Sequence, residues 1–95
     1  MVAKASRRFA LGQVVATPGA LEALQTSDQT PAEFLCRHVI GDWGEVCEGD
    51  AKLNDEAVEI GERLLSAYRT AKGERLWIIT EWDRSVTTLL LPEEY

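Results

Sequence analysis

The spacing of hydrophobic and polar residues divides the chain into a helical first part and a strand-rich last third. Residues 9–16 alternate loosely between the two classes and predict a strand. Thr17 followed by Pro18 is typical of a helix start, with threonine as the N-cap and proline in the first turn. Thr30 and Glu33 have the capping-box spacing, so we expect a second helix to begin there.

The middle of the chain predicts a loop and then a third helix. Gly41 is expected to end the second helix, because glycine readily adopts the backbone conformation of a helix C-terminus. Residues 41–50 contain three glycines and no periodicity, which predicts a loop ordered around Trp43. A third helix should follow, beginning at Asp50 or Asn54 and ending near Arg63, with an apolar stripe made of Leu53, Ala57, Ile60 and Leu64.

The last third of the chain predicts an antiparallel meander of three strands, over residues 64–69, 75–82 and 86–91. In the middle strand one face should carry Leu76, Ile78, Thr80 and Trp82, and the other Arg75, Trp77, Ile79 and Glu81. Helices first and strands last predict an α+β fold. Its N-terminal strand and two to three helices should pack on the C-terminal three-stranded antiparallel β-meander.

Length and composition are those of one small folded domain, residues 1–95, in which residues 1–8 are expected to be flexible. Hydrophobic residues make up 45% of the chain and charged residues 27%, which argues against disorder. No apolar run approaches the length of a membrane span, and Gly12 and Gln13 interrupt the segment that a signal peptide would need. We therefore expect a cytoplasmic protein that does not contact a membrane.

The negative charge is concentrated in one short segment. The net charge of the chain is −6 at pH 7, whereas the eight acidic residues and one lysine of residues 41–62 give that segment −7. Such a field repels phosphate and attracts basic surfaces, so direct binding of DNA or RNA is disfavoured. The segment predicts instead a surface that binds a basic protein partner, formed by Asp42, Trp43, Glu45, Glu48, Asp50, Asp55, Glu56, Glu59 and Glu62.

Cys36, His38 and Cys47 offer three potential metal ligands. A structural zinc site needs four ligands, usually in two closely spaced pairs, and this chain lacks those pairs. We therefore expect no metal and no cofactor, and we expect both cysteines to be buried, reduced thiols.

A catalytic role is the alternative for several polar residues of the second helix and the sheet. His38 is the only histidine and is a candidate general base, while an arginine would stabilise the charge of a phosphorane. The chain would then be a small metal-independent ribonuclease-like enzyme, with a site made of His38, Arg63, Tyr68, Glu81, Asp83 and Arg84. His38 also lies on the apolar face of its predicted helix, which favours a structural role with a lowered pKa. We favour a protein that is not an enzyme.

Several stretches of this chain taken together resemble a family of small bacterial proteins carried on plasmids, genomic islands and prophages. The resemblance rests on Val15–Ala20, Arg37–Gly44, Arg63–Tyr68, Trp77–Ser85 and Leu89–Tyr95, and so spans nearly the whole chain. Members are often labelled only as plasmid-related, or loosely as a restriction-system subunit. The resemblance implies a mobile-element setting, in which small acidic inhibitors of host defence are common.

These observations favour a stoichiometric inhibitor of a host defence complex or nuclease, of the anti-CRISPR or anti-restriction type. Its acidic surface would imitate nucleic acid, with carboxylates in the place of phosphates. Two alternatives stay open. One is the ribonuclease-like enzyme, and the other is an accessory homodimer formed through an exposed edge strand.

Overall fold

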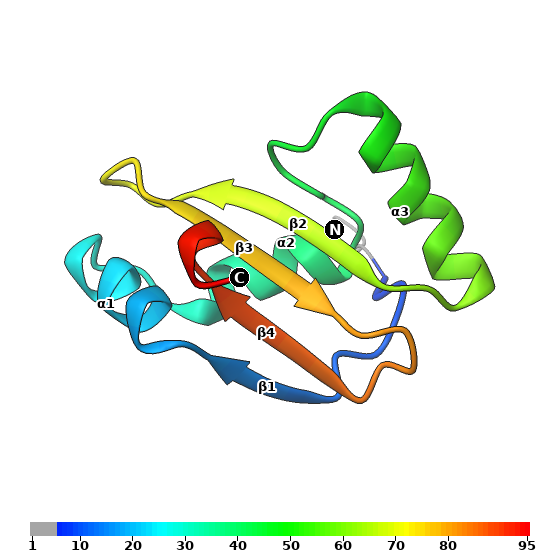
Figure 1. Cartoon of the computed structure of the whole chain (residues 1–95), viewed down its shortest axis with the longest axis horizontal. Helices are drawn as coiled ribbons and strands as arrows, with labels where there is room; N and C mark the ends of the chain where they lie inside the picture. The colour runs from blue at the N-terminus through cyan, green and yellow to red at the C-terminus, as the bar shows by residue number, and fades with distance from the viewer. Residues whose placement is uncertain (1–5) are drawn as a thin grey trace, which may run out of the picture.

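A computed structural model describes residues 6–95 of the chain (Figure 1). The predicted flexibility of residues 1–8 lies largely outside this range. Within it, Arg8 is held by a backbone hydrogen bond to Val39 (2.8 Å) and an ion pair with Asp55 (2.8 Å). The elements in chain order are β1 (Gln13–Ala16), α1 (Pro18–Thr26), α2 (Pro31–Val39), α3 (Glu48–Ile60), β2 (Leu64–Arg69), β3 (Arg75–Thr80), β4 (Val86–Leu90) and the short 3₁₀ turn η1 (Pro92–Glu94).

The strands form one mixed sheet in the order β1-β4-β3-β2. The strands β2, β3 and β4 are antiparallel neighbours, as the sequence predicts, and β1 adds a fourth strand parallel to β4. In Figure 1, α2 passes behind the sheet, α3 lies beyond the β2 edge, and the C-terminal turn lies in front. The α+β class is confirmed, with a sheet one strand larger than the predicted meander.

The helix starts follow the predicted capping chemistry. The hydroxyl of Thr17 accepts a hydrogen bond from the backbone N–H of Ala20 (3.2 Å), and so satisfies one of the unpaired donors at the start of α1. The carboxylate of Glu33 accepts from the backbone N–H of Thr30 (3.4 Å) at the start of α2. These local contacts fix where the first two helices begin and how they approach the sheet.

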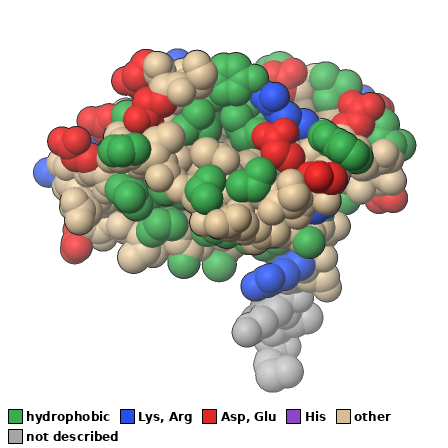
Figure 2. Space-filling model, turned by 60° about the horizontal axis from the view of Figure 1, so that its bottom comes forward, with side chains coloured by type: hydrophobic (Ala, Val, Ile, Leu, Met, Phe, Trp, Pro, Cys, Tyr) green, Lys and Arg blue, Asp and Glu red, His purple; other side chains and the backbone are tan. Residues whose placement is uncertain are grey.

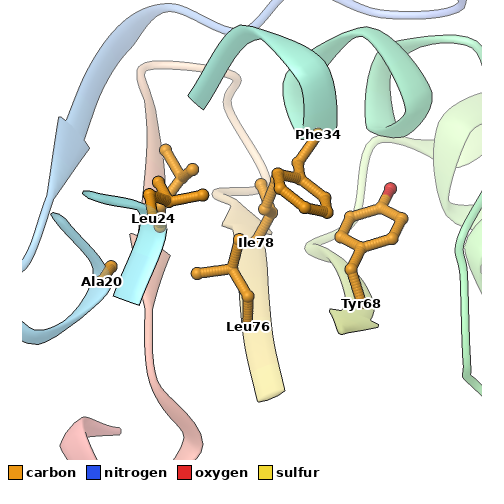
Figure 3. Packing of buried hydrophobic residues seen from close by; sticks show 7 residues of the cluster. Ala20, Leu24, Phe34, Tyr68, Leu76 and Ile78 are labelled. Atoms are coloured by element: carbon orange, nitrogen blue, oxygen red, sulfur yellow. The ribbon is translucent and has the colours of Figure 1, made fainter. Parts of the chain in front are cut away.

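The main hydrophobic core lies between the first two helices and one face of the sheet (Figure 3). Phe34 and Tyr68 face each other across α2 and β2, with ring centroids 5.5 Å apart, and Leu76 and Ile78 lie beside them. The cluster consists of Ala20, Leu24, Phe34, Tyr68, Leu76, Ile78 and Leu89, all of them buried. The alternation predicted for the middle strand is confirmed over β3, but Trp82 lies beyond its end and is exposed.

The predicted apolar stripe of the third helix is wrong. Ala57 and Leu64 are buried, but Leu53 and Ile60 are 63% and 67% exposed, the opposite of core positions. Asn54 takes the interior position on α3 instead. Its side-chain amide hydrogen-bonds both backbone groups of Leu65, donating to the carbonyl (2.8 Å) and accepting from the N–H (3.2 Å). The helix is therefore rotated so that an amide, rather than leucine, faces the β2 edge.

Replacing a buried core side chain should be costly, whereas the same truncation on the exposed side of α3 should not. We expect Ile78→Ala to lower the free energy of unfolding by roughly 2–5 kcal/mol, because Ile78 is fully buried and a cavity would remain. Ile60→Ala is the matched control and should change it by less than about 1 kcal/mol. Urea denaturation of the two variants measures both values. Equal losses of unfolding free energy in the two variants would contradict the placement of Ile78 in the core and Ile60 on the surface.

Candidate functional site

The centre of the molecule holds a buried chain of polar side chains around His38. Its Nδ1 lies 2.5 Å from the hydroxyl of Ser66 on β2, and its Nε2 lies 2.9 Å from the hydroxyl of Thr80 on β3. The Thr80 hydroxyl is 2.7 Å from that of Thr87 on β4, and Thr87 donates to the carbonyl of Leu11 (2.7 Å). The four side chains of His38, Ser66, Thr80 and Thr87 are fully buried.

The last acceptor determines the direction of these hydrogen bonds as far as Nε2 of His38. A carbonyl oxygen can only accept, so Thr87 donates to Leu11 and must accept from Thr80. Thr80 has then given its only proton to Thr87, so its oxygen accepts from the Nε2–H of His38. With the ring neutral, Nδ1 accepts from the Ser66 hydroxyl. Both ring nitrogens of His38 are thus engaged, and its low pKa makes the ring a neutral imidazole at pH 7. Burial is the main cause that lowers the pKa of His38 to about 4, and the positive charge of Arg84 adds to it. The sequence also predicts a lowered pKa.

The structure does not bring the proposed catalytic residues together. His38 and Tyr68 lie on the covered face of the sheet, where the Tyr68 hydroxyl donates to the Asp42 carbonyl (2.6 Å) and burial raises its pKa to about 12. Arg63 lies outside this interior and donates to the hydroxyl of Tyr95. The Arg84 guanidinium donates to the carbonyl of Ala57 (2.9 Å) and to that of Glu62 (2.5 Å), so it is used to hold the end of α3.

The two acidic members of that set are also separate from the histidine. Asp83 is exposed and accepts from both the N–H (3.1 Å) and the hydroxyl (2.6 Å) of Ser85, which closes the turn between β3 and β4. Glu81 follows β3 and extends the face that carries Trp77 and Ile79, opposite the face that packs on α2. The six residues therefore share no common cleft.

Both cysteines are exposed, so the prediction of buried thiols is wrong. Cys47 is the N-cap of α3, where its sulfur accepts from the backbone N–H of Asp50 (3.4 Å). Cys36 lies on the outer side of α2, while His38 points inward from the same helix with both nitrogens engaged. Of the three candidate metal ligands, Cys36 and Cys47 thus face solvent on different elements, whereas His38 faces the interior.

The predicted partner-binding residues fall into two groups, of which the first serves the fold. Asp42 pairs with Arg37 (2.7 Å) and Glu45 with Arg69 (3.0 Å). Asp55 pairs with Arg8 and accepts from the indole N–H of Trp43 (3.1 Å). Trp43 itself is buried between Phe9 and His38, so it cannot present its ring to a partner.

The second group lies on α3 and the turn that follows it, and its members are all exposed. It consists of Glu48, Asp50, Glu56, Glu59 and Glu62. Within residues 6–95, none of these five carboxylates has an ion-pair partner. We call this group the free carboxylates of α3.

A groove runs beside these carboxylates, between α3 and β2. It has a volume of about 390 Å³. Its apolar lining consists of Val46, Leu53, Ala57, Ile60 and Leu65, and its charged lining of Asp50, Glu56, Glu62 and Arg63. The lining residues absent from the predicted partner-binding surface are Val46, Leu53, Asn54, Ala57, Ile60, Arg63 and Leu65. The polar Asn54 within the apparent stripe of α3 was the one signal that this helix turns its leucine outward.

No protein-family model, curated protein or solved structure matches this chain. The resemblance to mobile-element proteins stays a prediction. In the part of the chain that the structure describes, no helix has the length and apolarity needed to cross a membrane.

The stability of the fold should fall as His38 is forced to accept a proton. The folded pKa of about 4 lies below the usual 6.5, so the unfolded chain binds more protons between these values. The contribution of His38 to stability is complete above pH 6.5 and falls as the pH drops toward 4, by about 2 kcal/mol at pH 5. Urea denaturation at pH 7 and pH 5 measures this change, above the range in which most carboxylates titrate.

The variant His38→Gln removes this titration. It should be less stable at pH 7, because glutamine cannot reproduce both ring hydrogen bonds, and its stability should change little between pH 7 and pH 5. Wild-type protein with no loss of stability over that interval would contradict the neutral, buried imidazole.

Proposed function

We propose that this protein acts by binding a protein partner that carries a basic surface, and that α3 with its following turn is the contact region. The observation that carries this proposal is the group of free carboxylates of α3, which are exposed and unpaired within residues 6–95. Clustered carboxylates on a rigid helix attract arginine and lysine side chains over about 8–10 Å at physiological salt.

The fold itself does not account for all of these carboxylates. Glu48 and Asp50 lie in the first turn of α3, where the helix dipole favours negative charge. Glu59 and Glu62 lie at the opposite end, where the same dipole disfavours it. The position of this second pair is therefore explained better by an external partner than by helix stability.

The partner that best fits the predicted setting is a nucleic-acid-binding protein of a host defence system. Its phosphate-binding groove would be lined by arginine and lysine, and carboxylates of α3 would occupy it in place of phosphates. The protein would then act as a stoichiometric inhibitor. This step rests on the resemblance to mobile-element proteins and on the charge of α3.

Reversing charge on α3 should weaken partner binding. We expect Glu56→Lys together with Glu59→Lys to retain the fold, because both residues are exposed, and to reduce capture of the partner from host lysate at least tenfold. Capture by the wild-type protein should also fall as salt is raised from about 50 to 200 mM. Where the captured protein is a nuclease, its inhibition should be complete near an equimolar ratio.

The control changes net charge equally but elsewhere. Glu22 on α1 and Glu93 in η1 are exposed, and their reversal to lysine should leave capture at the wild-type level. If the α3 double variant captures the same partner as the wild type does, α3 is not the contact region. If both double variants lose capture equally, net charge rather than a defined surface is responsible.

A further inference from the structure

We infer that the groove between α3 and β2 binds a basic amphipathic helix of the partner, with apolar side chains in the groove and arginine or lysine side chains against its rim. This inference rests on the proposed function and names the part of the partner that is recognised. It is distinct from simple imitation of nucleic acid, which requires carboxylates but no exposed apolar side chains.

The apolar component comes from two large side chains that the fold leaves in solvent. Leu53 and Ile60 are 63% and 67% exposed, and they are seven residues apart on α3. Seven residues are about two helical turns, so both side chains lie on one side of the helix, roughly 10 Å apart. Val46 and Leu65 also line the groove. The apolar residues of an amphipathic helix repeat with the same spacing.

The charged component comes from the rim of the same groove. Asp50, Glu56 and Glu62 line it, against the single positive charge of Arg63. These three carboxylates belong to the free carboxylates of α3. Glu59 belongs to them too but is not among the lining residues. An occupant with apolar side chains on one face and basic side chains on both flanks matches this arrangement.

The state of the β2 edge favours a helix over an extended peptide as the occupant. An extended peptide gains affinity by hydrogen-bonding the free backbone groups of an edge strand. At Leu65 both groups are already bonded to the Asn54 amide. At Ala67 the N–H donates to the Trp43 carbonyl (3.0 Å) and the carbonyl accepts from Glu45 N–H (2.6 Å). The β2 edge therefore offers these groups to no further strand, whereas a helix needs none.

A synthetic helical peptide provides the direct test. The probe is a peptide of about 15 residues, capped at both ends, with leucines at i, i+4, i+7 and i+11 and lysines on the flanking positions. Two controls keep its length: one replaces the leucines with glutamine, and the other replaces the lysines with glutamate. We expect only the leucine–lysine peptide to bind, with chemical-shift changes in the labelled protein centred on Leu53, Ile60 and Leu65.

Variants of the protein separate the two components of the groove. Leu53→Gln with Ile60→Gln should weaken peptide binding about tenfold or more without unfolding the protein, because both side chains are exposed. Leu21→Gln, at an exposed leucine of α1, is the apolar control and should bind as the wild type does. Glu56→Lys should weaken binding several-fold, and Glu59→Lys, away from the groove, should do so clearly less.

The outcomes distinguish failure of this inference from failure of the proposed function. If the glutamine variant still captures the basic partner while the charge reversal does not, contact is electrostatic alone, and the groove inference is overturned while the proposed function stands. If neither variant affects capture, the proposed function fails. Equal binding of the lysine peptides with and without leucine would also overturn the groove inference.

Discussion

The neutral imidazole of His38 is the point at which α2, the sheet and the N-terminal segment are joined. One run of hydrogen bonds passes from Ser66 on β2 through His38 on α2 to Thr80 on β3, and ends beyond β4 at the Leu11 carbonyl. Each polar group in it depends on the next for its partner, so the loss of any one leaves a buried group unsatisfied. Because hydrogen bonds are directional, the network restrains the position of α2 over the sheet in addition to the packing of Phe34.

Polar contacts also determine how α3 is attached, and this explains the exposed groove. Asp55 binds Arg8 and the indole of Trp43, and Asn54 binds the β2 backbone. At the other end, Arg84 donates to the carbonyl of Ala57. These bonds, together with the packing of the small side chains Ala51, Ala57 and Val58 in the cluster of Trp43 and Leu64, fix the rotation of α3. Its two largest apolar side chains therefore remain in solvent. The surface proposed for the partner is thus a consequence of the way in which the helix is held.

Helix starts and strand faces could be predicted from the sequence, because each is determined by residues that are close together in the chain. Thr17 marks the start of α1, and the alternation in β3 gives the faces of Leu76 and Trp77. These features depend on neighbours in the sequence. The parallel pairing of β1 with β4 joins residues more than 70 positions apart, and no local pattern contains it.

The candidate surface could be predicted only in its charge. The sequence shows which residues are acidic, but whether a carboxylate forms an ion pair depends on arginines far away in the chain. Asp55, for example, forms an ion pair with Arg8. The rotation of α3 was missed because a helical period locates a stripe without showing what it faces, and here an amide was needed to satisfy Leu65. Because Asn54 faces Leu65, Leu53 and Ile60 are exposed rather than buried as predicted.

The two edges of the sheet differ, and the difference limits how copies of this protein can join. The β2 edge is closed at Leu65 and Ala67 by Asn54 and by the loop at Gly44, where a positive φ of 75° and contact with the Ala67 carbonyl leave no room for a side chain. At the other edge, the parallel ladder leaves the backbone groups of Val14 pointing outward, on a side where hydrophobic side chains reach the surface (Figure 2). Continuous growth of a sheet needs two open edges on every copy. Within residues 6–95, a strand added at β2 would have to displace the Asn54 amide and the loop at Gly44, whereas a second copy could add at Val14 of β1, so this sheet disfavours continuous edge-to-edge growth.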